Sequence, residues 1–283
     1  MMDKVLDETL CERYPLLFRD RHAQMTTTAM AWGFACGNGW FDLIDALCEQ
    51  IELHLKASFE RGERLDVRVV QVKEKFGTLR FYTMGEDAFI HGLIWMAEDL
   101  SAVLCERCGR KGRVTRTESY AMACRCIEHG GILFASESPP FGSIETRPGV
   151  LLSLHDHPGL HHDQRQQRNR MLQPYPRLRE SLDKVALRYD AFPDEAFLIQ
   201  ASVGRLTQDV LVNRDPDLEF ELGEDPISGR PQFRWKEGVP PSFQDGKMQM
   251  AQAFLERYCS EQGKWQETLS ALSGEPSSFR PDA

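Results

Sequence analysis

Two closely spaced pairs of metal-binding residue types constrain this chain more than any other feature. Cys105 and Cys108 are followed by Gly109 in a Cys-x-x-Cys-Gly pattern, and Cys126 and His129 repeat the same spacing. A tight turn of this kind points two thiolates at one ion, and glycine tolerates the positive φ that the turn often requires. Four such ligands are typical of a closed, tetrahedral zinc site. The sequence therefore predicts one structural zinc ion.

Two other interpretations of the cysteine cluster remain open at this point. Cys124 lies two residues before Cys126 and could replace it, although only Cys126 repeats the two-residue gap, with His129. Alternatively, these residues are reduced thiols of a small core. The segment between the pairs is basic, which in zinc knuckles often accompanies nucleic-acid binding but is also typical of a solvated face. Its basic residues are Arg107, Arg110, Lys111, Arg113 and Arg116.

The order of predicted elements indicates an α+β fold. At about 150 residues per domain, 283 residues are enough for about two domains. We expect an α+β domain over 1–135 with the Cys-rich knuckle, a linker or long loop over 136–173, and a second α+β domain over 174–283. Hydrophobic periodicity predicts helices over 8–18, 40–59, 87–104, 176–189, 242–259 and 262–272. It predicts strands over 67–72, 79–82, 196–203, 209–213, 217–222 and 232–235.

A run of histidines lies in the middle segment, at His155, His157, His161 and His162. Closely spaced His and Asp residues bind hydrolytic metals in some enzymes, so a metal-dependent hydrolase is one alternative. The run fits no hydrolase signature, however, and no strand of convincing length precedes it. We interpret it as a polar loop. Because the chain also lacks a nucleophile elbow, a P-loop and a GxGxxG motif, we expect no enzymatic activity.

Negative charge is concentrated in one stretch of the second half. The chain carries 34 Lys and Arg against 43 Asp and Glu, a net charge of -9, which favours a basic partner over nucleic acid or an anionic membrane. The alternation over 217–222 predicts a strand with a row of carboxylates about 7 Å apart on one face. Such a row suits the basic cleft of a nuclease, and its alternative is a solubilising edge strand. The candidate partner-binding residues are Asp209, Asp215, Asp217, Glu219, Glu221, Glu224 and Asp225.

The N-terminus and the hydropathy pattern predict the compartment. No run approaches the ~18 consecutive apolar residues that a membrane span needs. The first fifteen residues lack the apolar core of a signal peptide. We therefore expect a cytoplasmic protein whose eight cysteines serve metal binding or packing instead of a disulfide framework.

Three motifs stand in the first 130 residues: WGFACGNGW at 32–40, QVKEKFGTLRFY at 71–82, and the Cys105-x-x-Cys108-Gly109 and Cys126-x-x-His129 pairs. With them the chain resembles a widespread bacterial and phage family without an assigned activity, whose members usually carry Asp where Asn38 stands. The thiol at Cys124 departs from the family pattern. The resemblance implies a zinc-ribbon-like module.

Over its full length the chain is similar to immunity proteins that neutralise nuclease effectors of type VI secretion systems. This similarity implies a cytoplasmic, non-enzymatic antidote that binds a toxin domain. It implies no particular binding residues, so the acidic stretch over 209–225 is our own candidate. The alternative function is a zinc-containing nucleic-acid-binding or regulatory module of phage origin.

Overall fold

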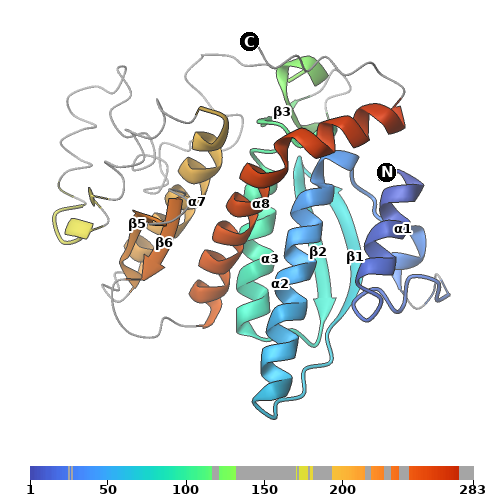
Figure 1. The fold of residues 1–283 in the computed structure, drawn as a ribbon, viewed down its shortest axis with the longest axis horizontal. Coiled ribbons are helices and arrows are strands. Elements are labelled where there is room, and N and C mark those ends of the chain that lie inside the picture. Colours follow the sequence, from blue (N-terminus) through green and yellow to red (C-terminus); the bar gives the residue numbers. More distant parts are fainter. Residues whose placement is uncertain are drawn as a thin grey trace.

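The computed structural model describes residues 1–24, 26, 28–116, 121–131, 170, 172–177, 179–180, 193–213, 218–225, 231–235 and 242–273. Three long helices, α2, α3 and α8, lie side by side, with the β1–β2 hairpin on one side and α7 with the β5–β6 hairpin on the other (Figure 1). Helices and small antiparallel sheets together confirm the α+β class. In chain order the elements are α1 (Lys4–Arg13), η1 (Ala29–Trp32), η2 (Asn38–Trp40), α2 (Phe41–Glu60), β1 (Arg68–Lys75), β2 (Thr78–Met84), α3 (Ala88–Ser101), β3 (Arg113–Arg116), β4 (Met122–Arg125), η3 (Ile127–His129), α7 (Pro193–Asn213), β5 (Phe220–Glu224), β6 (Pro231–Trp235) and α8 (Ser242–Ser273).

The helices of the first half follow the predicted hydrophobic periodicity. The predictions over 40–59 and 87–104 correspond to α2 and to α3. The α3 helix begins after Asp87, whose carboxylate accepts a hydrogen bond from the backbone N–H of Ile90 at 2.9 Å, as an N-cap does. The first helix, α1, begins four residues earlier than predicted, because Asp3 provides a similar cap.

The β1–β2 hairpin confirms the two predicted strands and explains the residues between them. Phe76 and Gly77 form its two-residue turn, with φ of 57° and 81°. Positive φ at both central residues matches the twist of the flanking strands. A Cβ on Gly77 would lie 2.7 Å from the side chain of Val114, so only glycine lets this turn pack against β3.

Predictions in the second half were less accurate. The strands predicted over 196–203 and 209–213 are wrong, because both segments belong to α7. The β-branched residues there pack as one helical face that includes Val203 and Val210, both fully buried. The strands over 217–222 and 232–235 correspond to β5 and β6, and the last two predicted helices form the single helix α8. The helix predicted over 176–189 lies mostly outside the described residues.

The two halves of the chain meet where α3 crosses α8. A Cβ on Gly92 would lie 2.0 Å from the carbonyl oxygen of Phe243, and one on Gly246 would lie 2.1 Å from that of Phe89. The two backbones therefore touch, and buried side chains from both halves belong to one hydrophobic cluster. The division into domains at 135 and 174 stays a prediction about folding units, which in this structure share a core. Among the described helices, none is long and apolar enough to cross a membrane.

Candidate metal centre

The four predicted ligands converge on one point. The ligand atoms of Cys105, Cys108, Cys126 and His129 all lie within 4.8 Å of one another. The Cys126 Sγ to His129 Nδ1 distance is 3.2 Å, the Cys105 Sγ to His129 Nδ1 distance is 3.6 Å, and the Cys108 Sγ to Cys126 Sγ distance is 3.7 Å. Zinc bond lengths of about 2.3 Å to sulfur and about 2.1 Å to nitrogen give tetrahedral edges of about 3.6 to 3.8 Å. These residues could therefore hold a metal ion, as predicted.

Each ligand pair is held in a turn that ends on a glycine with positive φ. In the first turn the backbone N–H of Gly109 donates to the carbonyl oxygen of Cys105 at 2.8 Å, and Gly109 has φ of 74°. The second turn is η3, which Gly130 ends with φ of 80°. Because the glycine follows the second ligand in both turns, the two knuckles have the same local design.

The β3–β4 hairpin connects the two knuckles. Its strands pair antiparallel, with Val114 opposite Cys124. An ion pair between Arg110 and Glu128 joins the first knuckle to the second. Further contacts tie the hairpin to the rest of the molecule: the backbone N–H of Glu106 donates to the carbonyl oxygen of Cys124 at 3.0 Å, and Arg125 pairs with Glu106.

Cys124 lies outside the ligand group. Its thiol is buried and donates to the carbonyl oxygen of Ala102 at 3.2 Å. Burial raises the pKa of this thiol, which disfavours the thiolate that a metal needs. The structure therefore groups Cys126, and not Cys124, with the other three candidate ligands.

The two thiols of the first knuckle have opposite pKa shifts. A hydrogen bond from Cys108 lowers the pKa of the Cys105 thiol to about 4, and backbone hydrogen bonds act in the same direction. The same hydrogen bond raises the pKa of Cys108, as does its burial. A metal ion bound by both sulfurs would favour the thiolate form of both residues, so its binding would release protons.

Residues 36–40, the CGNGW turn, pack against the turn that holds Cys105 and Cys108. The sequence analysis did not predict this contact. The indole N–H of Trp40 donates to the carbonyl oxygen of Leu104 at 3.0 Å, and the backbone N–H of Gly39 donates to that of Glu106 at 2.8 Å. A Cβ on Gly39 would lie 2.3 Å from the carbonyl oxygen of Cys105. The two glycines of the motif were the available signal, because they indicate that another backbone approaches closely.

The Glu106 carboxylate connects the same turn to β4. It accepts a hydrogen bond from the backbone N–H of Gly37 at 2.9 Å and forms an ion pair with Arg125 at 2.7 Å. Motifs that are about 70 residues apart in the sequence therefore form one unit around the candidate metal centre.

The acidic stretch does not form the predicted row of exposed carboxylates. Leu218, Phe220 and Leu222 are buried, as the alternation predicts. Glu219, however, is only 1% exposed and accepts a hydrogen bond from the backbone N–H of Arg177 at 2.7 Å. The prediction that it faces solvent is wrong because β5 begins only at Phe220, which lets Glu219 turn inward to a backbone donor.

The other described members of the stretch lie on different segments. Asp209 lies on α7, where its carboxylate pairs with the buried Lys247 at 2.8 Å. Glu221 and Asp225 are partly exposed. Asp215, Asp217 and the side chain of Glu224 lie outside what the structure describes, as do His155, His157, His161 and His162. The role of Glu221 and Asp225 in partner binding stays a prediction.

Comparisons of the chain with protein-family models, with curated proteins and with solved structures find no match.

Proposed function

We propose that this protein is a non-enzymatic immunity protein that contains a structural zinc ion and neutralises a secreted nuclease toxin by binding it. The observation that carries the proposal is the closed group of Cys105, Cys108, Cys126 and His129. Four protein ligands complete a tetrahedral zinc shell and leave no position for water or substrate, so the ion acts as a cross-link. The zinc ion supplies no reaction chemistry in this proposal.

Two further features support binding as the activity. The net charge of -9 favours a basic partner, and the catalytic domains of nucleases are basic where they bind phosphates. The resemblance of the sequence to type VI immunity proteins supports a nuclease toxin as that partner. Direct binding of nucleic acid is less well supported, because Arg110 and Arg125 near the knuckle already pair with Glu128 and Glu106.

Zinc content tests the first part of the proposal. The chain purified under reducing conditions should contain about one zinc per molecule, measured by a chromophoric chelator after denaturation. Cys108→Ser should lose it. Cys124→Ser is the matched control and should retain it, because Cys124 lies outside the ligand group. Equal zinc content in both variants would remove the ligand assignment.

Nuclease inhibition tests the second part. Candidate toxin domains encoded beside this chain should cleave DNA or RNA alone and stop doing so when one equivalent of the chain is added. A stable complex should elute together in gel filtration. Undiminished cleavage by every candidate at a large excess of the chain would overturn the proposed function.

A further inference from the structure

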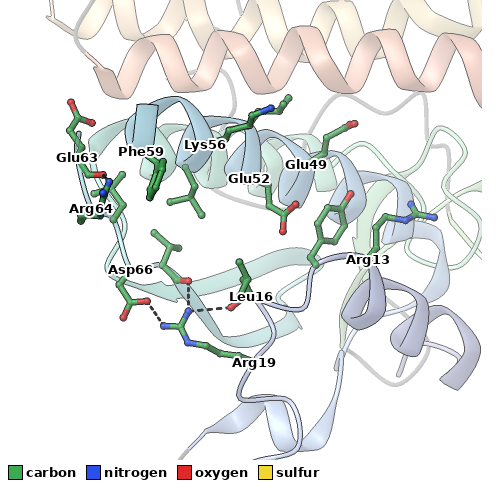
Figure 2. Close-up of a pocket in the computed structure, with 15 residues that line it drawn as sticks. Arg13, Leu16, Arg19, Glu49, Glu52, Lys56, Phe59, Glu63, Arg64 and Asp66 are labelled. Atoms are coloured by element: carbon green, nitrogen blue, oxygen red, sulfur yellow. Dashed lines mark hydrogen bonds and ion pairs between the residues drawn. The ribbon is translucent and has the colours of Figure 1, made fainter. Parts of the chain in front are cut away.

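A cavity of about 690 Å³ opens between the second half of α2 and the chain that faces it. Its walls come from α2, from the segment after α1 and from the segment that leads into β1 (Figure 2). Three of its apolar residues are largely exposed: Leu16 at 70%, Leu53 at 55% and Phe59 at 61%. Exposed apolar side chains gathered around one hollow are typical of a binding site.

Most of the charged side chains that line this cavity already have a partner. The ion pairs and the one cation–π contact are Arg13–Asp45 at 2.6 Å, Arg19–Asp66 at 2.8 Å, Glu49–Arg257 at 2.7 Å, Glu63–Arg61 at 3.0 Å, and Arg64 over the Phe59 ring at 4.0 Å. The ion pairs offset the charges of Arg13, Arg19, Glu49, Glu63 and Asp66, whereas Arg64 keeps its positive charge over the Phe59 ring. An arginine in an ion pair repels a cationic ligand less than a free arginine would.

The carboxylate of Glu52 differs from the other charged groups of the cavity wall. Its side chain points into the cavity (Figure 2), and within the described part of the chain no hydrogen bond or ion pair reaches it. Burial raises the pKa of Glu52, and no nearby cation opposes the shift. Lys56 lies one helical turn further along and also lines the cavity, but its side chain is exposed and its nitrogen points away from Glu52 (Figure 2).

We propose that this cavity binds a lysine or arginine side chain of the toxin domain, with its charged head on Glu52 and its aliphatic stem against Leu16 and Phe59. The identity of the partner rests on the proposed function, whereas the chemistry of the site rests on the cavity itself. Long basic side chains have this dual character, an apolar stem and a cationic end. The ion pair between Glu52 and the bound side chain would form in a partly enclosed site, where salt screens it less than on an open surface.

A short peptide tests the site without the toxin. The probe is the capped tripeptide acetyl-Leu-Arg-Leu-amide, compared with acetyl-Leu-Gln-Leu-amide, and binding is followed by methyl NMR shifts of the full chain. The arginine peptide should bind, and Glu52→Gln should weaken its affinity at least tenfold. Glu60→Gln is the matched control, because Glu60 is an exposed acid of α2 outside the cavity lining. Thermal unfolding of both variants checks that they are folded.

Three results would overturn the proposed site: no binding of the arginine peptide, equal binding of the glutamine peptide, or unchanged affinity in Glu52→Gln. Self-association of the chain that Glu52→Gln abolishes would also overturn it, by making a second copy the occupant.

The nuclease assay separates this inference from the proposed function. If the wild-type chain inhibits a nuclease and Glu52→Gln inhibits it equally well, the assignment of the cavity is wrong and the proposed function stands. If no nuclease is inhibited but the peptide depends on Glu52, the proposed function is wrong and the site for a basic side chain remains. If Glu52→Gln weakens the affinity for the nuclease at least tenfold and Glu60→Gln leaves it unchanged, both the proposed function and the proposed site are supported.

Discussion

Two carboxylates of α2 that lie two helical turns apart, Asp45 and Glu52, have opposite surroundings. At its N-terminal end Asp45 is only 2% exposed, and its carboxylate accepts from Tyr14 at 2.8 Å and pairs with Arg13 and Arg257. Two helical turns further along, near the middle of the helix, the carboxylate of Glu52 faces a cavity and has no such partner among the described residues. A buried carboxylate that pairs with residues of its own chain stabilises the fold. A carboxylate without such partners can instead pair with a ligand. The same helix thus connects the core of the molecule to its proposed binding surface.

Removing the Asp45 carboxylate should have the largest effect on stability. Asp45→Ala leaves two arginines without their common partner and should lower the free energy of unfolding by about 3 kcal/mol, measured by urea denaturation. Asp66→Ala is the control, because Asp66 is 90% exposed in its pair with Arg19 and should cost less than about 1 kcal/mol. Similar losses in the two variants would contradict the contrast.

The contact between the CGNGW turn and the knuckle should be the next most sensitive. Gly39→Ala places a methyl group against the backbone of Cys105 and should cost about 1–3 kcal/mol. It should also weaken zinc binding at least tenfold in a chelator competition. Gly223→Ala serves as the control, because its Cβ would meet only the carbonyl oxygen of Gln232, at 3.8 Å. Unchanged zinc affinity in Gly39→Ala would show that the turn does not position the ligands.

Removal of the metal should act locally. Treatment with a chelator should accelerate amide hydrogen exchange over 104–131 while the amides of α2 and α3 keep their protection. The reason is that the long helices are held by an extended core, whereas the proposed metal ion would cross-link the two turns that flank the β3–β4 hairpin. Uniform loss of protection across the helices would mean that the metal centre is needed for the whole fold.

The smallest effect on stability is expected from removing the charge of Glu52. Because burial raises the folded-state pKa of Glu52, the protonated form is favoured in the folded state. The corresponding stability is fully present below the unfolded pKa and is lost as the pH rises through the folded one. Glu52→Gln should therefore raise the thermal midpoint slightly near neutral pH and leave it unchanged near about pH 3. Glu60→Gln should change neither value, and a loss of stability in Glu52→Gln at neutral pH would contradict the absence of a partner.

The sequence predicted the first half of the fold well and the second half less well. Helix α2 and the β1–β2 hairpin have clear periodicity, and the Phe76-Gly77 turn has clear turn chemistry. The segment that forms α7 is rich in Val and Leu, and its β-branched residues suggested strands. Burial against α8 outweighed that local preference, as tertiary context commonly does.

Local spacing predicted the four candidate metal ligands, because each pair lies within one turn, but it left Cys124 as an alternative that only the structure placed outside the group. The sequence likewise determined the net charge of -9. Only the tertiary structure decided which carboxylates are neutralised. Arg257 reaches Asp45 across 212 residues of sequence, and the backbone of Arg177 turns Glu219 inward across 42. Charge can be counted along a chain, but whether a charge is paired depends on which segments folding brings together. Among the described acids that line the cavity, Glu49, Glu63 and Asp66 form ion pairs and Glu52 does not.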